Sequence, residues 1–154
     1  MEQATRPQTI GYALLDSPVA LAAWMLDHDT DAYYKIARAF VDGLPSGNLT
    51  RDHLLDNITL YWLTGTGASA ARSYWEAYGP DAPGAGQALP ADVRIPVAFT
   101  TFPGEIWRTP RSWTEKAYPN LVYFNEVDRG GHFAAWEEPE LFSAEVRAAF
   151  SSVR

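Results

Sequence analysis

Two strand-type segments separated by a helical one constrain the fold of this chain most strongly. Residues 93–100 and residues 121–127 are both apolar and rich in β-forming side chains. A helix start at Thr109-Pro110 lies between them. A strand–helix–strand unit of this length predicts two parallel strands joined by a right-handed crossover. Pro96 has no backbone N–H to donate, so we expect it near the start of the first strand.

The remaining segments favour helices. Ser17 can cap a helix that has Pro18 at its first position. We expect two further helices in the first half of the chain, one after residues 48–50 and one over residues 68–78, and a last helix that begins at Pro139. The inward face of the last helix is predicted to carry Phe142, Val146, Ala149 and Phe150.

A segment rich in Pro, Gly and Ala divides the chain. It covers residues 78–94 and has the composition of a linker. We therefore expect a helical, aromatic part with its linker over residues 1–90, and a strand–helix–strand–helix part over residues 91–154. The fold class is α/β.

Composition excludes several classes of function. The 154-residue chain carries a formal net charge of −7, which argues against nucleic acid or an anionic membrane as a partner. It has no cysteine, so thiol catalysis and thiolate metal sites are excluded. No apolar run approaches the ~20 residues that a membrane span needs. We expect a cytoplasmic location. We expect no bound metal and no other cofactor.

Two residues that follow the predicted strands are candidates for chemistry. His132 lies on a turn with Gly130 and Gly131, just past the second strand, and Glu105 lies just past the first strand. In open α/β sheets, catalytic groups gather at the carboxyl ends of the strands. An acid that hydrogen-bonds a histidine fixes its tautomer and stabilises the imidazolium that forms when the ring takes a proton.

Each candidate also has a plainer interpretation. His132 could be a surface or packing histidine, and Glu105 a solvent-exposed loop glutamate. A catalytic triad also needs a nucleophile on a strand-to-helix elbow of the G-x-S-x-G type or its aspartate version, and the chain has no such pattern. Three histidines far apart in sequence argue against a metal site.

Aromatic residues make up 14% of the chain, and several of them recur at helical spacing. Tyr61, Trp62, Tyr74 and Trp75 are expected in the core. Alternatively, one phenol points into a cavity and donates a hydrogen bond to a developing alkoxide. Spacing alone does not distinguish these tyrosines.

Several segments together resemble the C-terminal part of the microsomal-type epoxide hydrolases. These are residues 15–24, Tyr61–Thr66, Ser73–Glu76, the turn Phe102-Pro103-Gly104-Glu105, and the run from Arg129 to Glu140 (RGGHFAAWEEPE). The long final run is a specific signal, whereas an isolated Gly-Gly-His is common to many α/β-hydrolases. The resemblance extends over nearly the whole chain.

The resemblance implies an α/β-hydrolase fold in which a helical cap is inserted between sheet strands. Residues 1–90 would be the end of the cap, and residues 91–154 the last two parallel strands and helices of the core. It also implies hydrolysis of epoxides to diols through an aspartyl ester. By position, His132 would be the base, Glu105 its acid partner and Tyr74 one of two phenols that hydrogen-bond the epoxide oxygen.

The family's nucleophilic aspartate has no counterpart here, so we expect a fragment that is inactive alone. The expected substrate is a small apolar epoxide. Two alternatives remain: a fragment of another cap-bearing α/β-hydrolase, such as a haloalkane dehalogenase or an esterase, and a non-catalytic binding module. A truncated sheet leaves an edge and an apolar face uncovered, which predicts self-association through that edge.

Overall fold

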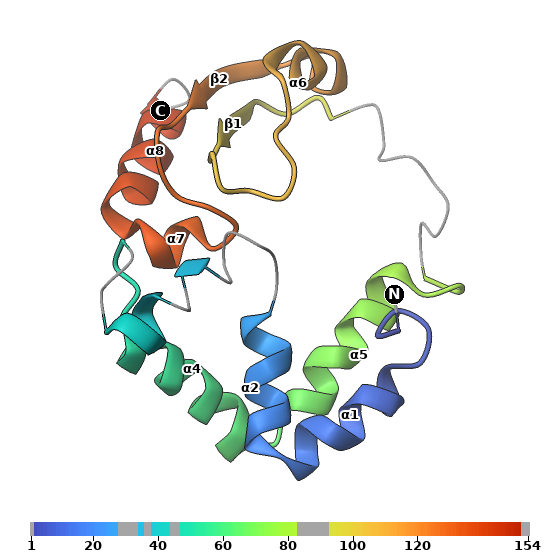
Figure 1. The fold of residues 1–154 in the computed structure, drawn as a ribbon. Coiled ribbons are helices and arrows are strands. Elements are labelled where there is room, and N and C mark those ends of the chain that lie inside the picture. The colour runs from blue at the N-terminus through green and yellow to red at the C-terminus, as the bar shows by residue number, and fades with distance from the viewer. Residues whose placement is uncertain (1, 28–33, 36–37, 44–46, 83–92, 152–154) are drawn as a thin grey trace. The chain divides into compact units, whose positions relative to one another are not determined.

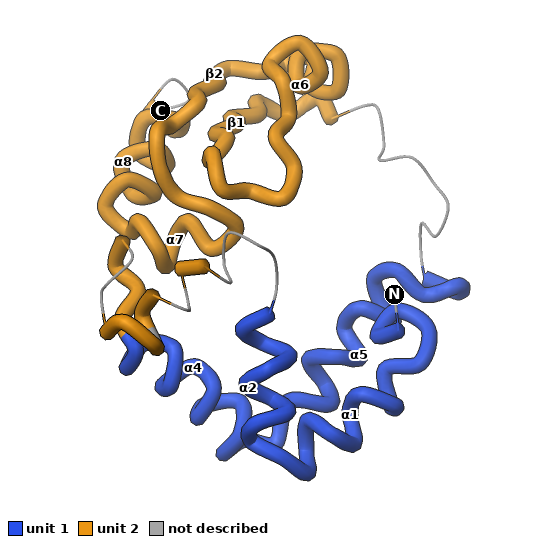
Figure 2. Tube along the Cα trace, in the orientation of Figure 1, with its two compact units in different colours: residues 1–28, 51–88 blue, residues 29–50, 89–154 orange. Residues whose placement is uncertain are grey.

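The chain divides into two compact units in the computed structural model (Figure 2). Unit 1 holds residues 1–28 and 51–88, and unit 2 holds residues 29–50 and 89–154. The structure describes residues 2–27, 34–35, 38–43, 47–82 and 93–151, so most of the expected linker lies outside the described residues. Residues 29–50 are grouped with the C-terminal part of the chain, whereas the sequence suggested one division near residue 90. The assignment of residues 1–90 to a cap stays a prediction.

Unit 1 is helical (Figure 1). Its described helices are α1 (Pro7–Asp16), α2 (Pro18–Leu26), α4 (Arg51–Thr64) and α5 (Gly67–Tyr78). The predicted cap of α2 is confirmed, because the Ser17 hydroxyl accepts a hydrogen bond from the backbone N–H of Ala20 at 3.2 Å. The starts of α4 and α5 also agree with the sequence. The separate helix α1 was not predicted; Arg6 precedes it and gives no side-chain cap.

Close packing of α1 on α5 builds the core of unit 1. A Cβ atom at Gly67 would lie 2.9 Å from the Cβ of Leu14, so only glycine allows this approach without a shift of the neighbouring helix. The buried apolar side chains that form the central cluster of this core are Leu14, Leu21, Ile58 and Ala71. Tyr61 and Trp62 pack against them partly buried, as expected of core aromatics. Aromatic packing therefore supports the helices of this unit.

Unit 2 contains the predicted parallel strand pair. Strand β1 (Val97–Thr101) pairs in parallel with β2 (Leu121–Glu126), and α6 (Arg111–Ala117) lies in the crossover. Strand β1 begins just after Pro96, as the missing N–H of proline predicted. The unit also contains a π-helical turn (Arg38–Asp42), α7 (Ala134–Glu137) and α8 (Pro139–Ser151). The start of α8 at Pro139 is confirmed.

The two faces of the sheet carry different contacts. On one face, the rings of Phe99 and Phe124 stack with centroids 6.0 Å apart, and Tyr118 at the end of α6 packs on Phe99. On the other face, the carboxylate of Glu145 on α8 accepts hydrogen bonds at 3.0 Å from Thr100, Tyr123 and Asn125. Helices α6 and α8 therefore contact opposite faces, and both strands are tied to α8 by one carboxylate.

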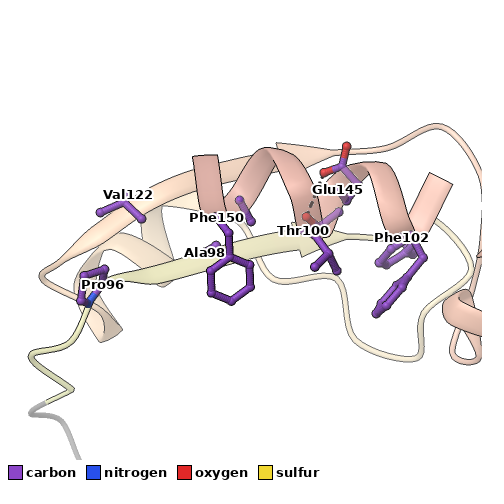
Figure 3. Close-up of a pocket in the computed structure, with 10 residues that line it drawn as sticks. Pro96, Ala98, Thr100, Phe102, Val122, Glu145 and Phe150 are labelled. Atoms are coloured by element: carbon purple, nitrogen blue, oxygen red, sulfur yellow. Dashed lines mark hydrogen bonds between the residues drawn. The ribbon is translucent and has the colours of Figure 1, made fainter. Parts of the chain in front are cut away.

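An apolar groove remains open beside α8 (Figure 3). It has a volume of about 340 Å³. Its apolar lining consists of Pro96, Ala98, Phe102, Val122, Phe142, Val146, Ala149 and Phe150. The expected inward face of α8 thus lines the groove, but Phe142 and Phe150 remain 38% and 58% exposed.

In the described part of the chain the sheet has two strands. None of the described helices is long and apolar enough to cross a membrane.

Candidate active site

The ladder between β1 and β2 continues past the ends of both strands. The N–H of Val127 donates to the carbonyl of Thr101 at 3.1 Å, and the N–H of Gly104 donates to the carbonyl of Gly130 at 2.9 Å. Gly104 and Gly131 form an isolated parallel bridge. Each of these two glycines is followed directly by a candidate residue. The strand pairing therefore brings the two candidate positions side by side.

The glycine turn after β2 requires its glycine. Gly130 has φ +94°, in the region that L side chains rarely adopt. A Cβ atom there would also lie 2.8 Å from Cδ1 of Phe102. Only glycine at this position therefore allows the turn to pack against Phe102 in the loop that follows β1.

The side chains of His132 and Glu105 meet at this edge of the sheet. Nδ1 of His132 lies 2.7 Å from Oε1 of Glu105, which is hydrogen-bond distance. Both are partly exposed, at 34% and 31% of their side-chain surface. With Nδ1–H donated to the carboxylate, Nε2 is the ring nitrogen that can take a proton from water. The structure thus brings together two of the three predicted site residues.

Local hydrogen bonds fix the loop that carries the acid. The carboxylate of Glu105 also accepts from the backbone N–H of Ile106 at 2.8 Å, and the N–H of Glu105 donates to the carbonyl of Phe102 at 3.2 Å. Nε of Arg108 donates to the carbonyl of Pro103 at 3.0 Å. Because the loop is held on both sides of Glu105, the carboxylate is directed at the histidine before any substrate binds.

Tyr74, the third predicted residue, belongs to unit 1. It lies on α5, half-buried, with its ring edge-on to Trp24 at a centroid distance of 6.2 Å. This ring contact fits the interpretation of Tyr74 as a packed aromatic. It does not involve the phenol oxygen, whose role needs a separate test. Its role as a hydrogen-bond donor to an epoxide stays a prediction.

The described residues include no metal site and no candidate nucleophile on a strand-to-helix elbow. No group of three or more His, Asp or Glu side chains in the described ranges could hold a metal ion. Ser69 and Ser73 lie within α5, where each hydroxyl donates to a backbone carbonyl of the preceding turn. Asp128, beside the histidine turn, pairs with Arg129 at 3.1 Å. None of the three occupies a strand-to-helix elbow.

Sequence reasoning missed one acidic residue near the site. Glu137, at the end of α7, has a side chain that is only 3% exposed and pairs with Lys35. In the sequence it is one of several acids in the run EEPE, where nothing marks it out from its neighbours. Only its burial distinguishes it, and the partner that permits burial is remote in the chain.

Comparisons with known proteins give a consistent result. No family model matches the chain. A relative from Stigmatella aurantiaca, whose name as an epoxide hydrolase is provisional, is 46% identical over 154 residues, which cover 99% of this chain and 32% of the relative. "Epoxide hydrolase 1" of Sus scrofa is 40% identical over 94% of this chain and 32% of its own length. The chain therefore spans about a third of the length of the curated relatives it matches.

Solved structures of epoxide hydrolases agree with the sequence comparisons. A juvenile hormone epoxide hydrolase from the silkworm Bombyx mori matches 98% of this chain and 38% of its own, with a TM-score of 0.78 and 31% identity. An enantioselective mutant of the epoxide hydrolase from Aspergillus niger matches 99% of this chain and 35% of its own, with a TM-score of 0.70 and 30% identity. The chain is thus homologous to a C-terminal portion of the epoxide hydrolases and has the corresponding part of their α/β-hydrolase fold.

Proposed function

We propose that Glu105 and His132 are the acid and base that activate water in an epoxide hydrolase reaction. The observation that supports this most directly is the 2.7 Å contact between Nδ1 of His132 and Oε1 of Glu105 at the carboxyl ends of two parallel strands. The names of the relatives support epoxides as the class of substrate, and favour this reaction over those of haloalkane dehalogenases and esterases.

The proposed reaction has two steps. In the first, an aspartate carboxylate that this chain does not supply attacks an epoxide carbon; the carbon–oxygen bond breaks, and the opened oxygen takes a proton from a phenol, here assigned to Tyr74. In the second, water attacks the carbonyl of the resulting ester, and its proton passes to Nε2 of His132. The Glu105 carboxylate stabilises the imidazolium. The ester carbon–oxygen bond breaks, and the departing diol oxygen takes the proton held by the His132 imidazolium. The aspartic acid that results gives its proton back to the phenolate, so the aspartate carboxylate, the phenol and the neutral imidazole are all regenerated.

The substrate that we propose is a small apolar epoxide. The high aromatic content of the chain, 14%, supports an apolar ligand. Several of these rings are half-buried in unit 1: Tyr61, Trp62, Tyr74 and Trp75.

A cytoplasmic location stays a prediction. We also propose that the chain self-associates through the uncovered edge of its sheet. The exposed apolar side chains of the groove beside α8 support this proposal.

A chimera tests the proposed roles. This chain would replace the matching third of Sus scrofa epoxide hydrolase 1, which is 40% identical over 145 residues. We expect the chimera to hydrolyse styrene oxide, and His132→Gln to slow diol formation by about 10²–10⁴-fold, the range for loss of general acid–base assistance. The purified chain alone should show no turnover, because its sequence has no nucleophile elbow.

A second histidine provides the matched control. His53 lies on α4 in unit 1, and His53→Gln should leave the chimera's rate within about twofold, as for a substitution outside the reacting groups. Equal losses from both substitutions would contradict a specific role for His132. His132-dependent turnover by the chain alone would contradict its expected inactivity.

A further inference from the structure

The buried carboxylate of Glu137 lies one helical turn after the candidate base. Its side chain is 3% exposed, and α7, which it ends, begins two residues after His132. A buried carboxylate costs stability unless it is paired and hydrogen-bonded. The contacts that compensate this burial therefore indicate what the residue does.

Each oxygen of this carboxylate has a partner. Oε1 accepts a hydrogen bond from the backbone N–H of Phe133 at 3.1 Å, and Oε2 forms an ion pair with Nζ of Lys35. Lys35 is itself 20% exposed and lies 102 residues earlier in the chain. One carboxylate thus joins the start of α7 to a remote segment of the same unit.

The backbone of Glu137 is held by the same remote part of the chain. The N–H of Asn48 donates to the carbonyl of Glu137 at 2.6 Å. A Cβ atom at Gly47, which has φ +58°, would lie only 2.5 Å from that carbonyl oxygen, so the two backbones approach each other as closely as glycine permits. Both the side chain and the backbone of Glu137 are therefore fixed.

Phe133 transmits this constraint to His132. Its N–H is bound by Glu137, and its ring lies edge-on to the His132 imidazole at a centroid distance of 5.0 Å and an angle of 82°. The Trp136 ring lies edge-on to the Phe133 ring at a centroid distance of 6.4 Å. A shift of Phe133 would rotate the imidazole away from Glu105, because the two residues are adjacent in the chain.

We propose that Glu137, neutralised by Lys35, is a positioning residue that holds the His132 imidazole in its hydrogen bond with Glu105. The catalytic meaning of this assignment rests on the function proposed above, but the positioning itself concerns only the conformation of unit 2. It can therefore be tested on the chain without any activity assay.

The test is histidine NMR on the full ¹⁵N-labelled chain, which reports the tautomer of His132 and the exchange of its Nδ1–H proton with water. We expect a single Nδ1–H tautomer in the parent chain. In Glu137→Ala, which removes both contacts, exchange should accelerate by about tenfold or more, as for loss of a buried hydrogen bond to a charged group. Glu137→Gln should rescue part of this, because its amide oxygen can still accept from Phe133.

Two further variants keep the result interpretable. The double variant Lys35→Met with Glu137→Leu removes both the ion pair and the hydrogen bond to Phe133 without leaving an unpaired buried charge, so it should fold even if Glu137→Ala does not. Glu115→Gln, which breaks an exposed pair with Arg111 on α6, is the control and should leave His132 unchanged. Parent-like His132 exchange and tautomer in the folded double variant would overturn the proposal. An inactive chimera with altered exchange in the variants would instead count only against the proposed function.

Discussion

The hydrogen bond between His132 and Glu105 depends on a residue that takes no part in it. Gly130 lets the turn after β2 fold back against Phe102 and so places its carbonyl 2.9 Å from the N–H of Gly104. This bond sets the separation of the two loops. The backbone contacts of the two loops thus determine how close the His132 and Glu105 side chains lie.

A methyl group at Gly130 should therefore disturb both stability and the site. Gly130→Ala combines a φ of +94° with a Cβ 2.8 Å from a Phe102 ring atom. We expect a loss of about 1–3 kcal/mol in the free energy of unfolding, typical of a strained backbone position. Urea unfolding measures the loss, and NMR of His132 shows whether its bond to Glu105 survives.

Gly43→Ala separates backbone strain from the close contact. Gly43 also has positive φ, at +64°, but nothing lies within 4 Å of a Cβ placed there. Its substitution should cost less than that of Gly130 and leave His132 unaffected. Equal costs at the two glycines would show that the approach of Phe102 is unimportant.

Helix α8 is tied to the sheet by a polar network that depends on pH. The pKa of the Tyr123 phenol is raised above its ordinary value of 10.0, first by burial, and further by the hydrogen bond and negative charge of Glu145. The folded state therefore holds the phenolic proton more tightly than the unfolded chain does. The stability linked to this proton is fully present below pH 10 and is lost as pH rises through the folded-state pKa.

Alkaline unfolding tests this network. The free energy of unfolding, measured in urea from pH 8 to pH 11, should fall with pH above about 10, and Tyr123→Phe should reduce that slope. Tyr12→Phe, which changes an exposed tyrosine on α1, is the matched control and should keep the parent slope. An unchanged slope in Tyr123→Phe would mean that other groups cause the dependence.

The elements differ in how well the sequence predicts them. Ser17 caps α2 and Pro96 precedes β1 because both effects are local to a few residues. The approach of His132 to Glu105 was also predictable, since parallel strands place their carboxyl ends at one edge. Helix α7 was missed because four residues are too few for a periodic pattern. The burial of Glu137 was missed because it depends on Lys35, far away in the sequence.

Long-range contacts also explain the division into units. Residues 29–50 belong to unit 2, where Asn48 donates to the carbonyl of Glu137. Nothing in the local sequence near residue 48 marks this partner. The boundary expected near residue 90 rested on linker composition, which indicates where a connecting segment is expected and not which segments pack together.

The groove beside α8 gives the proposed self-association a specific test. Phe150 lines the groove and is 58% exposed, so burial against a second copy would remove apolar surface from water. We expect multi-angle light scattering to show a species larger than the monomer. Phe150→Asp should shift it toward the monomer, whereas Trp107→Asp, at a residue exposed outside the groove, should not. A folded, monodisperse monomer of the parent chain would contradict self-association.

The central claim is that His132, directed by Glu105, activates the water that cleaves a covalent ester. Intact-protein mass spectrometry of the His132→Gln chimera after mixing with styrene oxide tests it most directly. The account predicts an adduct equal to the mass of the epoxide that persists, because ester formation does not need the base but ester hydrolysis does. Loss of the adduct in His132→Gln as fast as in the unsubstituted chimera would contradict the account.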